Sequence, residues 1–486
     1  MNVSMKEENI RDFVDFLRKS TPDIRKYLKD TAVLVVTHYD ADGLSSAAIL
    51  AGFLQKIDVA FHIRVLEQLD EESIENIRGL DYDVVIFSDM GSSVRNILTE
   101  RLRRSRIIII DHHPVLGGED RNRGHVYEYN PFLFGLDGST IASASTIAYL
   151  FAKCLEKTCV NLAPLAIVGA LGDRQDLGER YSLSGLNEIA VTDAVKNGLV
   201  KVEIGLRLFG LQTKPLVTCL ENTMDPFLPG LTGNEGACLL FLKRIGVQPV
   251  EKSRPRTYSS LSEDEKRRLA TELVKYLLSI GYSAKQAESI FGTLYYLVRE
   301  DPVSPLYDAR EYATLLNACG RLERYSLAIA LGLGFRGKTL HKAVSEFMKY
   351  KKILSEAINR ILSEEKYIRH FDHCVFVDAR DLIPQKMAGS IASILSSSRM
   401  IVAGKPVVVV AGKSKLKISV RKPWNALRRY KNLHLGEILA HATKEAGGFG
   451  GGHANAAGGL IPEEKLEEFV ESFNKIIGGG GYSKSY

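Results

Sequence analysis

Three short aliphatic runs in the first part of the chain each end in a cluster of acidic and histidine residues. The runs cover residues 33–36, 84–87 and 107–110, and the segments after them supply His38, Asp40 and Asp42, then Asp89, then Asp111, His112 and His113. A short apolar run rich in β-branched residues is typical of a buried parallel strand. Functional groups of open α/β sheets gather where the carboxyl ends of such strands meet. We therefore expect the three segments to converge on one cleft of a doubly wound α/β domain.

The length and composition indicate a globular protein of several domains. A chain of 486 residues exceeds what one hydrophobic core supports, so two or three domains are expected. Hydrophobic residues make up 45% and charged residues 25%, and no stretch offers the roughly 18 apolar residues of a membrane span. The first residues show neither a secretory signal nor a transit peptide, and the six cysteines lack paired spacing. We expect a soluble, cytoplasmic protein with reduced thiols and no membrane partner.

The patterns along the chain predict three regions and a tail. Residues 1–195 alternate strand and helix patterns, after an amino-terminal helix pair broken at Pro22, and predict the doubly wound domain. Residues 196–365 carry long helical patterns with few strand signals, and predict a mainly helical insertion and linker.

Strand patterns then return and predict a second, smaller α/β domain over residues 366–478. It has expected strands at 374–378, 400–403, 407–411 and 417–420, a glycine-rich segment and a final helix at 463–477. The tail, residues 479–486, cannot offset its ordering entropy by burial, so we expect it to be flexible.

A fourth acidic segment, Gly172-Asp173, follows the apolar residues 163–171. If it joins the others, four aspartates share one cleft, and each like-charge pair about 4 Å apart costs about 4 kcal/mol at an effective dielectric of about 20. Such a cluster requires cations. Carboxylates with a minority of imidazoles suit Mn²⁺ or Mg²⁺, whereas structural zinc more often recruits cysteine, which these segments lack. We expect Mn²⁺ to be preferred over Mg²⁺ because the imidazole ligands favour it.

The number of candidate ligands predicts two ions rather than one. The candidates are His38, Asp40, Asp42, Asp89, His112 and Asp173. Six ligands suit two divalent ions about 3.5 to 4 Å apart, bridged by a shared carboxylate and a water. Asp89 stands alone at its strand end and is the natural bridge. A water activated between two ions is positioned to attack phosphorus, so the implied reaction is hydrolysis of a phosphate ester or anhydride.

Each segment alone also has a simpler interpretation. The Asp40–Gly43 loop could be an ordinary turn or helix cap, and Gly172-Asp173 could cap the next helix. A glycine run is more often a flexible loop than a binding site, and the cations among residues 413–431 could form a solvated basic face. Three adjacent polar residues after a buried strand are less common, because each needs a partner. The segments together, each after an apolar run, favour the metal interpretation.

The same segments resemble a known family. Thr37–Gly43, Ser88-Asp89, Asp111–His113 and Gly172-Asp173 are similar to the four motifs of the DHH phosphoesterases. Gly450–Gly459 resembles the glycine-rich signature of their second domain, DHHA1. The resemblance covers both α/β domains and implies a DHH domain, the helical insertion and a DHHA1 domain.

The resemblance also implies roles for individual residues. His38 and Asp40 would hold one metal and Asp42, His112 and Asp173 the other, with Asp89 shared. His113 would face the scissile phosphate, and Asp111 would orient a ligand histidine. In the second domain, the implied substrate contacts are the backbone amides and imidazole of Gly451, Gly452 and His453, and the side chain of Arg421.

Within the family, the chain length and the helical region containing Asp225–Leu231 resemble the archaeal RecJ-like exonucleases, some of which associate with the replication factor GINS. The resemblance implies an exonuclease that is specific for single strands and acts in DNA replication or repair. Its expected substrate is single-stranded DNA, with 5′-to-3′ polarity favoured, and RNA is a further candidate substrate. The basic and aromatic stretch around Trp424 and Tyr430 would supply phosphate contacts and a stacking surface. The net charge of +6 permits such a polyanionic partner.

Two other functions stay open at this stage. One is cleavage of short RNA oligomers or cyclic dinucleotides with the same metals. The other is a replisome scaffold that binds GINS or a replicative helicase, like the catalytically degenerate relative in the eukaryotic helicase. The full set of expected ligands favours an active enzyme.

Overall fold

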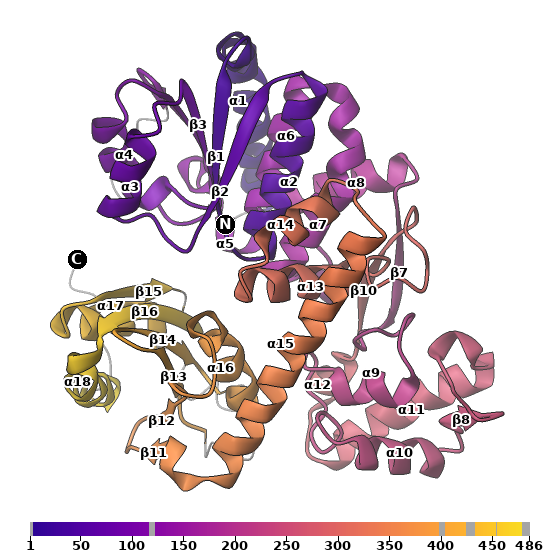
Figure 1. The fold of residues 1–486 in the computed structure, drawn as a ribbon. Helices are drawn as coiled ribbons and strands as arrows, with labels where there is room; N and C mark the ends of the chain where they lie inside the picture. Colours follow the sequence, from indigo (N-terminus) through magenta and orange to yellow (C-terminus); the bar gives the residue numbers. More distant parts are fainter. Residues whose placement is uncertain (1–2, 116–121, 398–403, 424–432, 453, 479–486) are drawn as a thin grey trace. The chain divides into compact units, whose positions relative to one another are not determined.

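The computed structural model describes residues 3–115, 122–397, 404–423, 433–452 and 454–478. The chain forms two compact units, Met1–Val344 and Ser345–Tyr486. Each unit contains a six-stranded sheet, and the first also carries two smaller two-stranded sheets (Figure 1). None of the helices in the described ranges is long and apolar enough to cross a membrane.

The main sheet of the first unit has the strand order β2-β1-β3-β4-β6-β5. Its strands are β1 (Ala32–His38), β2 (Ala60–Leu66), β3 (Val84–Ser88), β4 (Arg106–Ile110), β5 (Asn122–Arg123) and β6 (Val126–Tyr129). Neighbouring strands are parallel except for β5 and β6. Because β1, β3 and β4 are adjacent and run in the same direction, their carboxyl ends meet at one edge.

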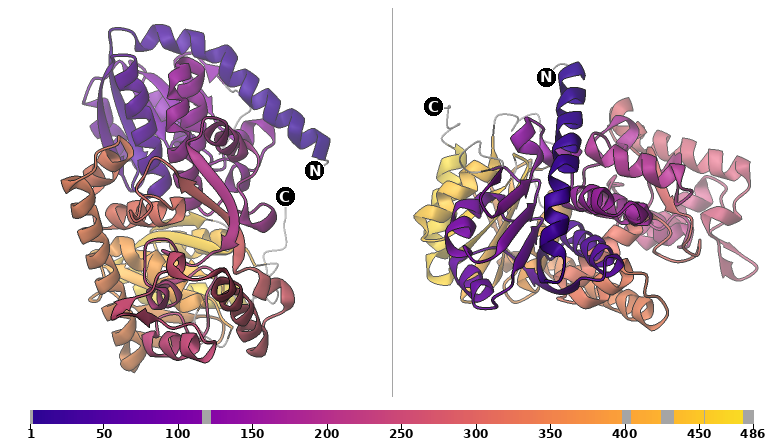
Figure 2. Two further views of the ribbon diagram at one scale, coloured as in Figure 1. Left: turned by 90° about the vertical axis from the view of Figure 1, so that its right-hand side faces the viewer. Right: turned by 90° about the horizontal axis from the view of Figure 1, so that it is seen from above.

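Helices cover both faces of this sheet. They include α1 (Val3–Leu28), α2 (Ala41–Lys56), α3 (Glu71–Arg78), α4 (Arg95–Arg101), α5 (Gly138–Ile141), α6 (Ala144–Leu155) and α7 (Ala163–Gly172). Alternate residues of β1, such as Leu34 and Val36, pack with Ile74 and Leu98 of α3 and α4. Helices α2 and α6 lie on the opposite face (Figures 1 and 2). The prediction of a doubly wound α/β domain is confirmed.

The expected break at Pro22 is wrong, because α1 is one helix. Pro22 lacks the N–H that would bond to the carbonyl of Arg18. The hydroxyl of Thr21 donates to that carbonyl instead, at 2.9 Å. The apolar face of the helix is fully buried on both sides of the proline, at Leu17 and Ile24. Burial of this face and the substitute hydrogen bond together keep the helix continuous.

The middle of the chain is mainly helical, as expected. Its helices are α8 (Leu186–Lys196), α9 (Leu216–Asn222), α10 (Glu235–Arg244), α11 (Glu263–Ser279), α12 (Ala284–Glu288), α13 (Ala309–Arg321), α14 (Tyr325–Gly332) and α15 (Lys338–Ser363). Residues of α9 to α12 form a hydrophobic core of their own. The antiparallel strands β7 (Val200–Leu206) and β10 (Phe291–Leu297) were not expected, and a short hairpin, β8 (Val250–Glu251) and β9 (Arg254–Pro255), lies between them in the sequence.

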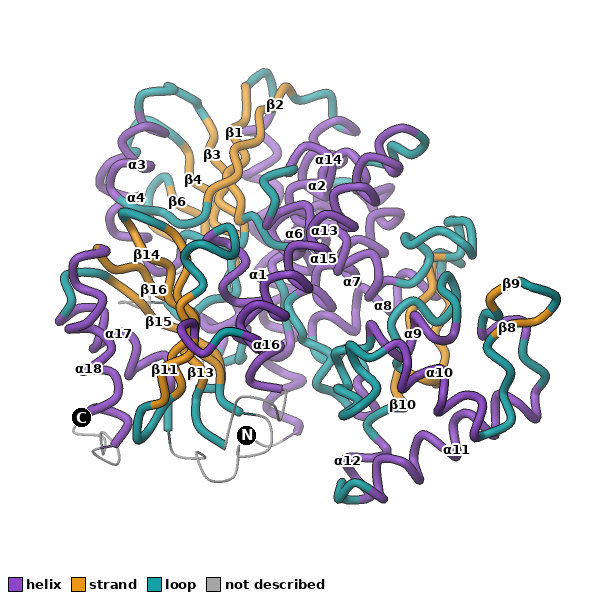
Figure 3. Tube along the Cα trace, turned by 60° about the horizontal axis from the view of Figure 1, so that its bottom comes forward, coloured by secondary structure: helices purple, strands orange, loops and turns teal. Residues whose placement is uncertain are grey.

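The second unit has the strand order β11-β12-β13-β14-β16-β15. Its strands are β11 (Ile368–His370), β12 (Val375–Asp378), β13 (Val407–Gly412), β14 (Lys415–Arg421), β15 (Phe449–Gly452) and β16 (Ala456–Pro462). Helices α16 (Ala388–Ser397), α17 (Leu435–Glu445) and α18 (Leu466–Gly478) pack on this sheet (Figure 3). The smaller α/β domain is therefore present, while the strand expected at 400–403 lies outside the described residues.

The glycine-rich segment of the second unit forms strands rather than a loop. Strands β15 and β16 pair in antiparallel register, with Gly450 opposite Gly459 and Gly451 opposite Gly458. A Cβ at Gly436, in the first turn of α17, would lie 2.0 Å from the carbonyl oxygen of Gly452. The glycines therefore let a helix approach the sheet backbone closely.

Candidate metal centre

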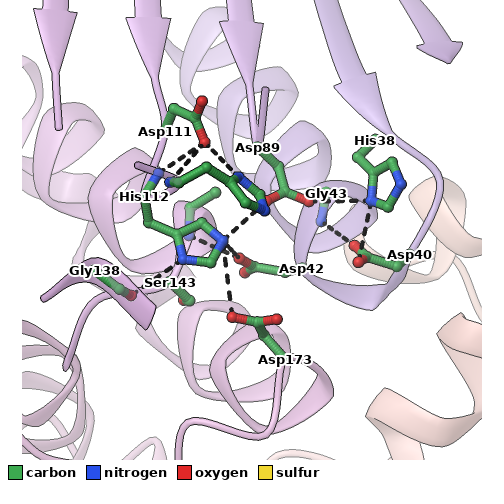
Figure 4. Close-up of polar contacts among 12 residues, drawn as sticks. His38, Asp40, Asp42, Gly43, Asp89, Asp111, His112, Gly138, Ser143 and Asp173 are labelled. Atoms are coloured by element: carbon green, nitrogen blue, oxygen red, sulfur yellow. Dashed lines mark hydrogen bonds and ion pairs between the residues drawn. The ribbon is translucent and has the colours of Figure 1, made fainter. Parts of the chain in front are cut away.

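Six acidic and histidine side chains gather at the carboxyl edge of the first sheet (Figure 4). Strands β1, β3 and β4 end within two residues of three of them, the start of α2 supplies two, and the residue after α7 supplies the last. The six are His38, Asp89, His112, Asp40, Asp42 and Asp173. All six residues that the sequence suggested as metal ligands therefore lie together. Asp173 follows a helix rather than a strand.

One group of donor atoms surrounds His38. Its Nδ1 atom lies 3.1 Å from Oδ2 of Asp40 and 3.4 Å from Oδ2 of Asp89. Asp40 also caps α2 by accepting a hydrogen bond from the backbone N–H of Gly43 at 3.0 Å. The three ligand atoms lie within 4.8 Å of one another, a spacing that could hold a metal ion.

A second group surrounds His112. Its Nε2 atom lies 3.9 Å from Oδ2 of Asp42, 3.7 Å from Oδ2 of Asp173 and 3.2 Å from Oδ1 of Asp89. Asp42, His112 and Asp173 also present ligand atoms within 4.8 Å of one another. Asp89 thus directs one oxygen to each imidazole, so the two groups adjoin at this carboxylate.

The charges in the cluster are unbalanced. Burial, reinforced by the negative charge of Asp89, raises the pKa of Asp42 to about 7. Burial also raises the pKa of Asp173 to about 6; His112 opposes this rise, and Asp89 adds to it. Although burial opposes protonation of His38 and His112, the surrounding carboxylates raise the pKa of both imidazoles. The side chains thus retain protons to offset excess negative charge, and bound cations would relieve the same repulsion.

Asp89 adopts an unusual backbone conformation. Its φ of 60° lies in the left-handed region, which is uncommon for residues other than glycine. Its N–H donates to the carbonyl of Ile110 at 2.9 Å, which ties this corner to the end of β4. Its Oδ2 atom is buried and accepts no hydrogen bond from any residue in the described ranges. The turn therefore directs a carboxylate oxygen into the cluster at some cost in backbone strain.

Asp111 lies beside the cluster and holds the histidine pair in place. Its Oδ1 atom accepts hydrogen bonds from the backbone N–H of His112 at 2.8 Å and from Nδ1 of His113 at 2.8 Å. Its Oδ2 atom accepts from the backbone N–H of Ser92 at 2.9 Å. Although burial opposes ionisation, His113 and these donors hold the pKa of Asp111 well below its usual range. The bond to Nδ1 leaves Nε2 of the half-exposed His113 available for another partner.

Gln175 contacts two of the cluster residues and was not singled out from the sequence. It is fully buried, and its Nε2 atom donates to Oδ2 of Asp173 at 2.8 Å and to the carbonyl of Gly138 at 3.0 Å. The same carbonyl lies 3.1 Å from Nδ1 of His112. A carbonyl can only accept, so Nδ1 carries a proton, and with a cation bound Nε2 would present its lone pair to that cation. The position of Gln175, two residues after Asp173, was the sequence signal that could have identified it as a neighbour of the cluster.

Two asparagines outside the motifs also support the site. Asn130 donates through Nδ2 to the carbonyl of His113 and to the hydroxyl of Ser92, both at 2.8 Å. Asn317 of α13 accepts a hydrogen bond from the backbone N–H of Ala41 at 3.0 Å, at the first residue of α2. Helix α13 was expected to be part of the insertion, and no local sequence signal placed it against the first acidic loop.

Glycines allow α2, α6 and α7 to approach one another behind the cluster. The carboxylate of Asp42 accepts hydrogen bonds from the backbone N–H groups of Ala144 at 2.7 Å and Ser145 at 3.0 Å, at the start of α6. A Cβ at Gly169 of α7 would lie 2.1 Å from Oγ of Ser145 and 2.6 Å from Oδ1 of Asp42. Because Gly169 has no side chain, it leaves room for the carboxylate of Asp42.

The residues suggested as substrate contacts lie in the second unit. Arg421 ends β14 and donates through Nη1 to the carbonyl of Val420 at 2.9 Å and through Nε to the hydroxyl of Ser393 at 3.2 Å. Gly451 and Gly452 lie in β15, and a Cβ at Gly451 would meet no atom within 4 Å. His453, Trp424 and Tyr430 lie outside the described residues. The contacts of all these residues with substrate remain predictions.

Comparison with family models matches three regions of the chain. Residues 32–170 match the DHH family N-terminal domain, residues 208–291 match the DHH-CID domain, and residues 372–479 match the DHHA1 domain. An uncharacterized protein of Methanocaldococcus jannaschii is 30% identical over 453 residues, which cover 92% of this chain and 93% of the relative.

Solved structures share the fold at low sequence identity. CDC45 from Entamoeba histolytica is similar with a TM-score of 0.61 and 13% identity, over 97% of this chain and 99% of that chain. RecJ from Thermus thermophilus in complex with Mn²⁺ is similar with a TM-score of 0.53 and 18% identity, over 96% of this chain and 55% of that chain. A structure of exonuclease RecJ bound to manganese is similar with a TM-score of 0.52 and 18% identity, over 95% of this chain and 94% of that chain.

Proposed function

The chain belongs to the DHH/DHHA1 superfamily and is RecJ-like, and we propose that it is a two-metal-ion exonuclease that hydrolyses single-stranded nucleic acid from one end. The observation that carries the proposal is the pair of adjoining ligand groups that share Asp89. The family and the fold support a metal-dependent phosphoesterase. Single-stranded DNA with 5′-to-3′ polarity, and RNA as a further substrate, are our proposed refinements.

The donor set fits two divalent cations. Four carboxylates and two imidazoles with no cysteine suit Mn²⁺ first and Mg²⁺ second. His38 and Asp40 would hold one ion, Asp42, His112 and Asp173 the other, and Asp89 both. When bound, the ions would supply Lewis acidity for water activation and for neutralising charge on the phosphate.

His113 would contact the substrate directly, and Asp111 would act on it through His113. The hydrogen bond from Nδ1 of His113 to Asp111 fixes the orientation of the imidazole and stabilises its protonated form. Nε2 would then donate to the phosphate or to the leaving oxygen. Burial and the neighbouring His112 lower the pKa of His113, but the carboxylates Asp111 and Asp89 outweigh both effects and raise it overall. In the second unit, Arg421, Gly451, Gly452 and His453 would contact the substrate.

A digestion series on end-labelled strands tests the proposed activity. With Mn²⁺ present, we expect successive shortening of long single-stranded DNA or RNA, mononucleotide products and no cleavage of blunt duplex. Comparing 5′-labelled with 3′-labelled strands gives the polarity, and raising the salt concentration should weaken binding because phosphate contacts release counterions. Activity confined to dinucleotides and other very short oligomers would instead establish the alternative phosphodiesterase function.

We also propose that the protein associates with a replication complex that contains GINS. The fold likeness to CDC45 over nearly the whole chain supports this proposal. Such binding is separable from hydrolysis if the partner contacts a surface away from the cluster. Co-elution of GINS with the wild-type chain and with the Asp89→Asn variant to the same extent is the expected result, and failure of both to co-elute would contradict the proposal.

Gln175→Leu should weaken metal binding without unfolding the protein. The substitution removes the donor that fixes Asp173 and the Gly138 carbonyl, and support of this kind is worth about 10-fold to 100-fold in metal affinity. Calorimetric titration with Mn²⁺ measures the change. Gln212→Leu is the matched control, since its Nε2 atom bonds to the hydroxyl of Tyr296, away from the cluster. Equal Mn²⁺ affinity in the Gln175→Leu variant and the wild-type chain would show that Gln175 does not position the ligands.

His113→Gln should lower kcat while leaving Mn²⁺ binding within a few fold of the wild-type value. The ring lies at the edge of the cluster and is half-exposed, and loss of a proton donor at the reacting group costs about 10²-fold to 10⁴-fold. The measurements are the single-turnover rate on a labelled single strand and a Mn²⁺ titration of the same sample. A parallel loss of the single-turnover rate and of the Mn²⁺ affinity would show that His113 is a metal ligand instead.

A further inference from the structure

A cavity of about 460 Å³ lies in the first unit at the ends of α2 and α7 that are opposite to the metal centre. The last turn of α2, the start of α7, the end of β10 and the end of α14 line it, and these elements lie close together in Figure 1. Its volume falls in the range of small-molecule sites. Neither the predicted metal ligands nor the predicted substrate contacts line this cavity.

One side of the cavity is apolar. Leu165, Leu199 and Leu297 line it and are 7%, 3% and 5% exposed. Leu162 and Leu333 complete this side as partly buried residues. The wall suits the apolar body of a ligand, because burying such a body removes hydrocarbon surface from water on both partners.

The other side is cationic. Arg336 donates through Nε to Glu300 at 2.9 Å, so these two charges are paired. Lys56 and Arg299 also line the cavity; both are exposed, and Lys56 donates to Oγ1 of Thr158 at 3.5 Å. Neither forms an ion pair with a described carboxylate, although the charge of Lys56 lowers the pKa of the Glu156 carboxyl. The rim of the cavity therefore carries two cations outside any ion pair.

A buried tyrosine marks the same place. Tyr312 of α13 lines the cavity and is 1% exposed, and its hydroxyl makes no hydrogen bond to any described residue. A buried hydroxyl without a partner is unfavourable, and an acceptor oxygen on a ligand would satisfy it. The charges that act on this hydroxyl are those of the Arg336–Glu300 pair, so it lies on the same cationic side of the cavity.

We propose that this cavity binds a small organic anion with an apolar body, independently of hydrolysis at the metal centre. Lys56 and Arg299 contact the anionic group, Tyr312 donates to it, and the leucines cover the rest of the molecule. Two sources share this chemistry, a nucleoside monophosphate and a short-chain fatty carboxylate.

Calorimetric titration of the full chain with AMP and with octanoate, in the presence of EDTA, tests the proposal and separates the two sources. EDTA prevents phosphate binding through divalent ions. We expect saturable binding of one of the two with one molecule per chain. Arg299→Glu and Lys56→Glu should each weaken it by about tenfold or more, because each replaces an attractive charge by a repulsive one. Leu333→Trp should block it by filling the cavity.

Arg267→Glu on the exposed face of α11 is the control and should leave the affinity unchanged. Tyr312→Phe keeps the ring and removes the hydroxyl, so it should weaken binding without lowering the melting temperature of the free protein, which also shows that the variant folds. Failure of both AMP and octanoate to saturate at millimolar concentration would overturn the proposal. The proposal would also be overturned if every cavity variant bound the ligand with the wild-type affinity.

Discussion

Asp89→Asn is expected to reduce Mn²⁺-dependent hydrolysis by about 10³-fold or more. Asp89 is the residue whose two oxygens approach both imidazoles of the cluster, at 3.4 Å from His38 and 3.2 Å from His112. Asparagine has nearly the same shape and tolerates the left-handed backbone, so the turn should persist. The loss therefore reports the missing charge of the shared ligand rather than a disrupted fold.

A matched control is available at Asp58, just after α2. Asp58 is exposed and has a φ of 55°, so Asp58→Asn makes the same change in the same backbone conformation away from the cluster. It should keep full activity. The measurements are the initial rate on a labelled single strand and the number of Mn²⁺ ions bound per chain. Full activity in the Asp89→Asn variant would refute the metal assignment.

Gly169→Ala should destabilise the first unit by about 2 to 3 kcal/mol and abolish hydrolysis. By helix propensity alone, alanine inside α7 would stabilise the protein. The new methyl group would however lie 2.1 Å from Oγ and 2.6 Å from Cβ of Ser145, and 2.6 Å from Oδ1 of Asp42. Helices α6 and α7 would have to separate, and Asp42 would move away from His112.

Gly236→Ala is the control for this substitution. Gly236 lies in α10, is exposed, and its nearest contact for a new Cβ is 3.6 Å away. This variant should be more stable by up to about 1 kcal/mol and fully active. Urea unfolding followed by circular dichroism, together with the hydrolysis rate, tests the pair. A Gly169→Ala variant as stable as the wild-type chain would show that α6 and α7 are not in contact at this point.

The sequence predicted the edge of the sheet where the cluster lies, and the reason is local. Each of the three aliphatic runs is a buried strand, and the polar residues follow at its carboxyl end, where a parallel sheet brings them together. Asp173 was also identified because it follows an apolar run, but that run is the helix α7 rather than a strand. Its position at the end of α7 depends on how that helix packs.

Other features could not be predicted because they depend on distant parts of the chain. Gln175 gains its contacts only when Gly138 arrives from a separate loop, and Asn317 lies in α13, far along the chain from the loop that it contacts. Strands β7 and β10 pair across the whole of the region between them. The sequence of β7 alternates between apolar residues and Lys201, Glu203 and Gly205, a strand signal that was available, whereas β10 has no such alternation. The glycines of β15 weaken any strand signal, yet the approach of α17 requires them.

The left-handed turn at Asp89 has an evolutionary consequence. A side chain at this backbone angle is strained, and glycine would remove that strain. Asp58 keeps an aspartate in the same conformation away from the cluster, so the fold tolerates this residue type at such a turn. A lineage that no longer needed its cations would therefore be free to exchange Asp89 for asparagine or glycine without losing the turn.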